Sequence, residues 1–182
     1  MLTVACVLSP GPIYTREHVA RLEAMVAEYM TQPYRFMCLD DSPFPGWWAK
    51  ISLFEPGRFT DRVLYLDLDV TVVGSLDEIA DYPWPFAAIK DYERQGLNSS
   101  VMSWGPIWAD HVYAGFTPDV MDRPGGDQAW ITELQPNAAT FPPNWCPSYK
   151  HQCRYSVPQG AKVVVFHGRP KSWELTKDLV FA

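Results

Sequence analysis

Apolar runs of strand length alternate with helical patterns through the first third of the chain. Residues 2–8 and 34–39 are mostly apolar, and each run ends in turn-forming residues. Between them, apolar side chains recur at helical spacing over residues 19–30. A second helix is expected over 47–54, before a third apolar run at 63–66. This order of strands and helices predicts a parallel sheet with right-handed crossovers.

The remainder of the chain continues the alternation with shorter elements. The pattern predicts further strands over 85–90, 101–104 and 163–166. It predicts further helices over 76–80, 106–114 and 128–134. Residues 135–158 are rich in Pro, Asn and aromatic residues with little periodicity, and we expect an ordered loop that forms a wall of a binding cleft.

Two carboxylates follow the run at 63–66. In an extended chain alternate residues face the same side, so Asp67 and Asp69 are expected to point at one spot. Unpaired carboxylates this close would raise each other's pKa, and a hard divalent cation would remove the conflict. The pattern therefore predicts a metal site at a strand end, although Asp-x-Asp taken alone is also typical of a solvated acidic turn.

Composition narrows the class of protein. A length of 182 residues suits one domain over 1–182, and 47% hydrophobic against 20% charged residues indicates a globular chain. The net charge of −6 argues against a nucleic-acid partner. Because no signal peptide and no apolar run of membrane-spanning length is evident, we expect a cytoplasmic protein without a membrane span.

More polar groups lie just past predicted strand ends, where the strands of a parallel sheet converge. Asp40, Asn98, His167 and Lys171 are of this kind. His167 is a candidate third metal ligand, since imidazole and carboxylate together suit manganese. Lys171 is a candidate for meeting a diphosphate. Taken singly, each has a plainer interpretation as a turn residue or a solvated surface group.

The joint order of these groups resembles the GT-A glycosyltransferases, close to glycosyltransferase family 8, the glycogenin and galactosyltransferase group. The resemblance covers most of the chain and rests on four segments: 62–69 (the DxD strand), 98–102, the pair 127–128, and 167–173. Three features depart from the family pattern. The spacing from His167 to Lys171 is short, Ser100 stands for a glycine, and Lys50 stands for an arginine.

The resemblance implies a GT-A fold, that is, a Rossmann-like, mixed and mainly parallel sheet flanked by helices. It implies that Asp67, Asp69 and His167 hold Mn²⁺ or Mg²⁺, which bridges the phosphates of a nucleotide sugar and stabilises the leaving diphosphate. It further implies that Lys50 and Lys171 offset phosphate charge.

The same resemblance implies roles around the donor sugar. Asn98 and Asp127 would bind its hydroxyls, and Gln128 would lie beside the anomeric carbon. Tyr14 and Asp40, or its neighbour Asp41, would hold base and ribose. The implied reaction moves a hexose, with retention, from a nucleotide diphosphate sugar (UDP-sugar expected) to a carbohydrate or glycoconjugate acceptor.

Two other functions stay open. One is a nucleotide-sugar or glycan binding protein that keeps the fold without turnover. The other is a nucleotidyltransferase, which also uses metal-bound carboxylates on an α/β sheet. The loop at residues 9–12, Ser-Pro-Gly-Pro, argues against the second, because it lacks the glycines and basic residues of a phosphate-binding loop.

Overall fold

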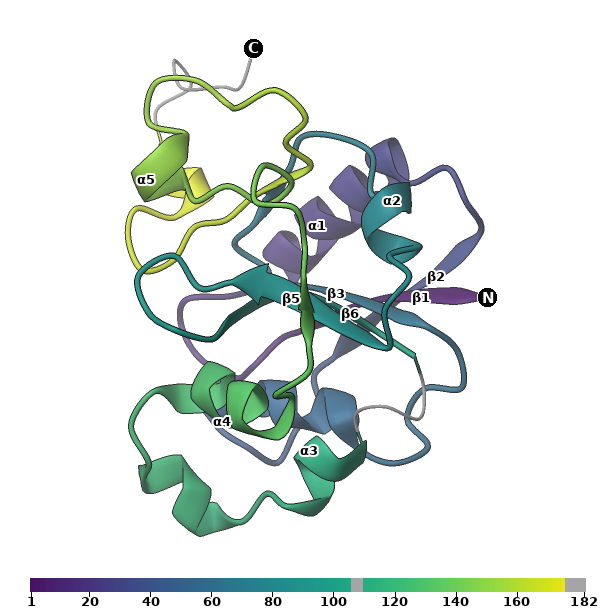
Figure 1. Cartoon of the computed structure of the whole chain (residues 1–182), viewed down its shortest axis with the longest axis vertical. Helices are drawn as coiled ribbons and strands as arrows, with labels where there is room; N and C mark the ends of the chain where they lie inside the picture. The colour runs from purple at the N-terminus through teal and green to yellow at the C-terminus, as the bar shows by residue number, and fades with distance from the viewer. Residues whose placement is uncertain (106–109, 176–182) are drawn as a thin grey trace.

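A mixed sheet of six strands forms the centre of the computed structural model, which describes residues 1–105 and 110–175. The strand order is β2-β1-β3-β6-β5-β7. The strands are β1 (Leu2–Val7), β2 (Tyr34–Leu39), β3 (Val63–Leu66), β5 (Phe86–Lys90), β6 (Leu97–Trp104) and β7 (Ala139–Thr140). Figure 1 shows the sheet with helices on both faces, so the predicted α/β class is confirmed.

Three of the strand pairings are parallel and two are antiparallel. β1 pairs in parallel with β2 and β3, and β5 pairs in parallel with β7. β6 runs antiparallel to β3 and β5, because only residues 91–96 connect β5 to β6 and so short a connection cannot make a parallel crossover. β6 also begins earlier than predicted, so Asn98 lies within this strand rather than in a turn before it.

Helices cover both faces of the sheet. They are α1 (Arg16–Tyr29), η1 (Gly46–Phe54), α2 (Asp77–Ala80), α3 (Asp110–Ala114), η2 (Pro118–Asp122), α4 (Gly126–Leu134), α5 (Tyr149–Gln152) and η3 (Ser172–Glu174). The helix expected over 47–54 forms as the 3₁₀-helix η1. The first four residues of the helix predicted over 106–114 lie outside the described residues. No helix in the described part of the chain combines the length and apolarity needed to cross a membrane.

Successive side chains of β3 point to opposite faces of the sheet, and all of them are apolar or aromatic, which explains why helices cover both faces. Leu64 and Leu66 pack into one core together with α1 and α2. Val63 and Tyr65 pack into a second core together with η1, α3 and α4. All four side chains are buried, as expected for a central strand with helices on either side. Both faces of β3 are therefore packed against a core, and this packing holds the carboxyl end of the strand in place.

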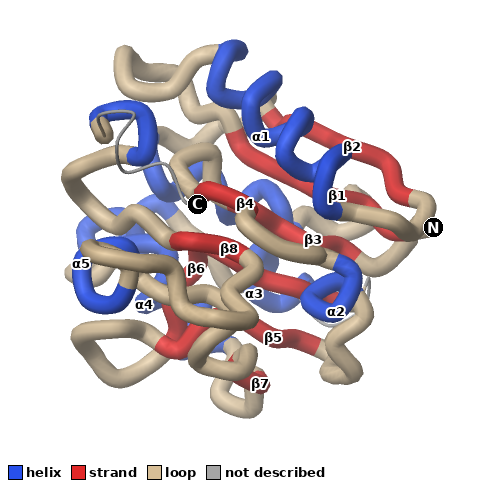
Figure 2. The backbone as a smooth tube through the Cα atoms, turned by 90° about the horizontal axis from the view of Figure 1, so that it is seen from above, coloured by secondary structure: helices blue, strands red, loops and turns tan. Residues whose placement is uncertain are grey.

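A second, smaller sheet brings the C-terminal part of the chain to the carboxyl end of β3. β4 (Thr71–Val72) pairs antiparallel with β8 (Val163–Val164), and Figure 2 shows the two strands side by side. β4 was not predicted, and β8 is shorter than the expected strand over 163–166. Because β4 follows the turn after β3 directly, this pairing places the segment after β8 beside that turn.

A pair of thiols joins β1 and β2. Cys6 and Cys38 are register partners on these strands, and both are free thiols. Cys6 is buried, whereas Cys38 is partly exposed. A hydrogen bond with Cys6 lowers the pKa of Cys38, and Arg16 lowers it further, against an opposing effect of burial. Cys38 therefore has more thiolate character than an ordinary cysteine at neutral pH.

We predict that Cys38 reacts with iodoacetamide with a pH midpoint below the value of about 8.5 of an ordinary thiol. Mass spectrometry after brief alkylation across a pH series measures this midpoint. Buried Cys153, whose pKa burial raises to about 11, serves as the slow internal reference. The variant Cys6→Ala should raise the midpoint of Cys38, because it removes the largest cause of the lowered pKa. A wild-type midpoint at or above that value would contradict the prediction.

Candidate active site

The predicted metal-binding carboxylates lie in a turn at the carboxyl end of β3. The strand ends at Leu66, and the Val70 amide donates to the Asp67 carbonyl at 3.4 Å. Asp67 and Asp69 therefore do not alternate along an extended strand, and the geometric reason given for their proximity was wrong. The turn nevertheless places them close. Burial raises the pKa of Asp69, the Asp67 carboxylate raises it further, and the Lys171 ammonium lowers it in part.

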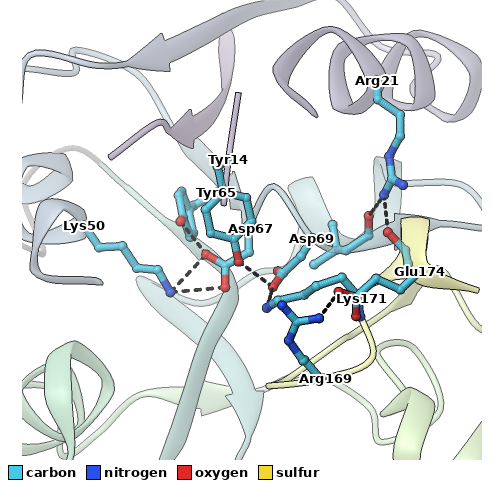
Figure 3. A network of polar contacts seen from close by, with 11 residues as sticks. Tyr14, Arg21, Lys50, Tyr65, Asp67, Asp69, Arg169, Lys171 and Glu174 are labelled. Atoms are coloured by element: carbon cyan, nitrogen blue, oxygen red, sulfur yellow. Dashed lines mark hydrogen bonds and ion pairs between the residues drawn. The ribbon is translucent and has the colours of Figure 1, made fainter. Parts of the chain in front are cut away.

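Asp67 belongs to a buried network of charged groups (Figure 3). The Tyr65 hydroxyl donates to Asp67 Oδ1 at 2.6 Å, and Lys50 Nζ lies 3.0 Å from the same oxygen. Lys50 Nζ also lies 3.4 Å from Asp127 Oδ2 and donates to the Ser99 hydroxyl at 3.0 Å. The Ser99 hydroxyl in turn donates to Asp127 Oδ2 at 2.6 Å. Lys50 thus connects the carboxylate after β3 with the one in the first turn of α4.

Asp69 forms the second half of the network. The Tyr14 hydroxyl donates to Asp69 Oδ2 at 2.8 Å, and the Lys171 ammonium forms an ion pair with the same carboxylate (Figure 3). The Asp69 and Lys171 side chains are only 8% and 15% exposed, so water screens this pair weakly. Lys171, the lysine predicted to bind a diphosphate, therefore contacts Asp69 in the turn after β3, here called the DxD turn (residues 67–69).

Local contacts hold the segment that carries Lys171. The Lys171 amide donates to Glu174 Oε2 at 2.8 Å, which closes the start of η3. Arg21 of α1 donates to the Val70 carbonyl at 2.9 Å and to the Ser172 hydroxyl at 2.6 Å. One guanidinium therefore ties the C-terminal segment to the turn after β3, and the position of the Lys171 ammonium depends on it.

The network carries a fixed charge pattern. Burial lowers the pKa of Lys50, but the carboxylates of Asp127 and Asp67 outweigh it and the net shift is upward, so this lysine stays charged. Burial and the neighbouring carboxylate raise the pKa of Tyr14, which stays a neutral hydrogen-bond donor. Three carboxylates (Asp67, Asp69 and Asp127) face two ammonium groups (Lys50 and Lys171), which leaves one formal negative charge.

The donor chemistry of Asp67 and Asp69 fits a hard divalent cation, since both offer carboxylate oxygens in one turn. His167 is held elsewhere. Its Nε2 lies 2.7 Å from the Ser148 hydroxyl, and its ring stacks between those of Tyr92 and His151. Within the described ranges, Asp67, Asp69 and His167 do not form a set of ligand atoms within 4.8 Å. A direct role for His167 at this turn requires a different side-chain arrangement.

Three other predicted residues lie at or beyond the edge of the network. Asn98 is buried on β6 beside Ser99, and its Oδ1 accepts from the Ser100 amide at 3.0 Å. Gln128 donates to Asp91 Oδ2 at 2.7 Å and so points toward the β5–β6 turn. Asp40 forms a surface ion pair with Arg16. The predicted residues that the structure brings together are Tyr14, Lys50, Asp67, Asp69, Asp127 and Lys171.

A cavity of about 470 Å³ opens on the Lys50–Asp67 side of the network. Its lining includes residues 9–13 after β1, together with Tyr14, Trp47, Lys50 and Asp67. The volume lies in the range of about 300–1,000 Å³ that is typical of small-molecule sites. The loop over 135–158 was expected to form the cleft wall. It contributes instead to a smaller cavity of about 140 Å³, lined by residues 89–92, 141–143, 146 and 152.

Sequence reasoning missed two members of the network. Tyr65 precedes Asp67 by two residues, and a buried tyrosine hydroxyl needs a hydrogen-bond partner. The sequence therefore offered a reason to expect this contact. Ser99, which bridges Asp127 and Lys50, lies within the segment 98–102 that carries the resemblance, but no role was predicted for it, because a serine in a strand is ordinary. Only the antiparallel placement of β6 beside β3 brings it to the site.

Comparison with known proteins gives matches at the level of structure. No family model and no curated protein matches the chain. The glycosyltransferase GlyE of Streptococcus pneumoniae TIGR4 superposes with a TM-score of 0.71 and 15% identity, over 96% of this chain and 56% of GlyE. The galactosyltransferase LgtC, solved with donor and acceptor sugar analogs, superposes with a TM-score of 0.61 and 15% identity, over 98% of this chain and 91% of LgtC.

A third match is a glycosyltransferase involved in the glycosylation of the major capsid of PBCV-1, with a TM-score of 0.64 and 16% identity, over 90% of this chain and 92% of that one. The chain thus spans little more than half the length of GlyE. At sequence identities this low, the superpositions establish the fold alone. This fold was predicted from the resemblance of the four segments. The chain has the GT-A fold of these glycosyltransferases.

Proposed function

We propose that the chain is a divalent-cation-dependent glycosyltransferase. It would move a hexose from a nucleotide diphosphate sugar, with UDP as the expected nucleotide, to a carbohydrate or glycoconjugate acceptor with retention. The observation that carries this proposal is the buried network of Asp67, Asp69 and two lysines at the carboxyl end of β3, beside the cavity of about 470 Å³. The GT-A fold supports it, because open α/β sheets bind ligands at this edge.

Asp67 and Asp69 would hold Mn²⁺ or Mg²⁺, with His167 proposed as a third ligand after rearrangement. A bound cation supplies Lewis-acid stabilisation of the leaving diphosphate. The two carboxylates already lie in one turn, so they need no long-range movement to share a ligand.

The lysines supply positive charge to the same region. Lys171 lies on Asp69, and Lys50 reaches Asp67 and Asp127. Because its carboxylate neighbours keep Lys50 protonated, it can offset negative charge that develops on a diphosphate. The Tyr14 hydroxyl stays neutral beside the cavity and can donate to a phosphate or ribose oxygen. Asp40, directly after β2, is the proposed contact to the ribose.

The sugar would lie nearer to α4. Asp127 is oriented by the Ser99 hydroxyl and Lys50, so its carboxylate can accept from sugar hydroxyls without reorganisation. Asn98 adjoins Ser99 on β6 and is the second proposed sugar contact. Gln128 would have to leave Asp91 to reach the anomeric carbon.

We predict that Asp127→Asn lowers kcat by about 10- to 100-fold, because a hydrogen bond to a charged group contributes about 1.5–3 kcal/mol. The dissociation constant for UDP should change much less, since UDP lacks the hexose that Asp127 is proposed to contact. A UDP-release assay and calorimetric titration with UDP measure the two quantities. Exposed Asp119→Asn on η2 is the matched control and should behave as wild type. Unchanged turnover in Asp127→Asn would leave Asp127 only a structural role at the start of α4.

A second candidate function is a nucleotide-sugar or glycan binding protein without turnover. It is favoured by one observation: Lys50 and Lys171 already neutralise much of the charge of the two carboxylates. A chain that has replaced its cation by lysines would need such pairs, and it would bind nucleotides without releasing product.

Turnover separates these two candidates. The chain is incubated with UDP-glucose and with UDP-galactose, in Mn²⁺ and in EDTA, and released UDP is measured over time. A transferase releases UDP slowly by hydrolysis even without an acceptor, and only in Mn²⁺. Saturable UDP binding without UDP release, with or without acceptor sugars, would establish the binding protein instead.

A further inference from the structure

Three metal-ligating side chains converge outside the network described above. One ligand atom each from Glu93, His151 and His167 lies within 4.8 Å of the other two. Glu93 belongs to the turn between β5 and β6, His151 to α5, and His167 follows β8. Three segments far apart in the sequence therefore place two imidazoles and a carboxylate together.

The spacing within the cluster approaches that of a metal centre. His151 Nε2 lies 3.2 Å from Glu93 Oε1. In a tetrahedral site with bonds of about 2.0–2.1 Å, neighbouring ligand atoms are about 3.3–3.4 Å apart. The His151 and Glu93 side chains are 46% and 55% exposed, so both are free to adjust toward the third ligand.

Contacts with neighbouring side chains hold His167, the least exposed of the three ligands. Its Nε2 contacts the hydroxyl of buried Ser148 at 2.7 Å, and its ring stacks on Tyr92 with centroids 5.4 Å apart. The Tyr92 hydroxyl donates to the Cys146 carbonyl at 2.6 Å, which holds this ring in turn. A hydrogen-bonded partner that orients the imidazole is typical of metal-ligating histidines.

The turn that carries Glu93 is also ordered by local contacts. Asp91 Oδ1 accepts from the amides of Glu93 and Arg94, at 2.8 and 2.7 Å. One basic group opposes a cation, because the Lys150 ammonium lies near His167 and Gly168. Lys150 is a partly exposed residue of α5, and a bound cation would require its ammonium to move away.

We propose that Glu93, His151 and His167 form a zinc-binding site, distinct from the cation site at Asp67 and Asp69. Two imidazoles with a single carboxylate suit Zn²⁺, whereas Mn²⁺ and Mg²⁺ favour sites in which oxygen ligands predominate. Zinc binding requires no transferase activity, so it can be measured without turnover. Zinc at this site would hold His167 away from Asp67 and Asp69, so the two cations would compete for this imidazole.

The test is calorimetric titration of the full chain, reduced and stripped with EDTA, with ZnCl₂. We expect one zinc per chain. His151→Ala and Glu93→Gln should each weaken binding by at least about tenfold, since even residues that only orient metal ligands contribute 10- to 100-fold. Two variants should retain wild-type affinity: His111→Ala, which removes an exposed histidine elsewhere, and Asp69→Asn.

Cobalt substitution tests the ligand type. Co²⁺ at this site should give visible absorption of nitrogen and oxygen ligation without the near-ultraviolet bands of thiolate ligation. The proposal is overturned if zinc binds His151→Ala and Glu93→Gln as tightly as wild type. It is equally overturned by thiolate bands, which would assign the zinc to the cysteines, or by the absence of zinc binding.

Discussion

Asp69→Asn is expected to weaken Mn²⁺-dependent binding of UDP by about 100-fold or more while the chain still folds. Asp69 is a proposed cation ligand, and even outer partners of metal ligands contribute 10- to 100-fold to affinity. The substitution keeps the shape of the side chain and a hydrogen-bond acceptor for Tyr14 and Lys171. It also removes the repulsion from Asp67 that raises the pKa of Asp69, which offsets part of the cost of leaving the Lys171 ammonium without its carboxylate.

Calorimetric titration with UDP in Mn²⁺ measures this effect, with thermal unfolding as the check on the fold. Asp61→Asn is the matched control, because Asp61 lies just before the same strand at its opposite end and pairs with the chain's amino group. This control should bind UDP as wild type does. Equal UDP affinity in wild type and Asp69→Asn, with Mn²⁺ present, would remove Asp69 from the cation site.

Lys50→Met is expected to lower the free energy of unfolding by about 3–5 kcal/mol, the cost of leaving a buried charge without its partner. Lys50 is 13% exposed and lies between Asp67 and Asp127, so its removal leaves both carboxylates without their shared ammonium. Pairing raises the pKa of Lys50. Its contribution is therefore complete below the unfolded value of about 10.4 and is lost only as the pH rises through the higher folded value.

Urea unfolding at neutral pH measures this loss of stability. Lys90→Met, at the exposed end of β5, is the matched control and should change stability by no more than about 0.5 kcal/mol. A change below about 1 kcal/mol for Lys50→Met would show that the network does not depend on Lys50. In that case a cation or solvent would have to balance the carboxylates.

The long periodic elements were predictable from the sequence. β1, α1 and β2 appear close to their expected bounds, because apolar spacing and turn residues agree there. β4 was not predictable, because a strand of two residues has no period. Apolar Leu68 and Val70 made the turn after β3 look like a continuing strand.

The site was predictable only in part. The positions of Lys50, Asp127 and Lys171 followed from the resemblance to known motifs, and the structure brings them together with the carboxylates. The surroundings of His167 were not predictable, since Tyr92 and His151 come from segments without periodicity. The contact of Gln128 with Asp91 likewise depends on how the β5–β6 turn meets α4.

The central claim is that a nucleotide diphosphate binds at the DxD turn with a divalent cation. The most direct measurement is the melting temperature with UDP and with UDP-sugars, each in Mn²⁺ and in EDTA. A ligand at a hundredfold excess over its dissociation constant stabilises the native state by about 2.7 kcal/mol. For a chain of this size that is a rise of about 5–10 °C. The account predicts such a rise in Mn²⁺ and its loss in EDTA; no rise with any nucleotide would contradict it.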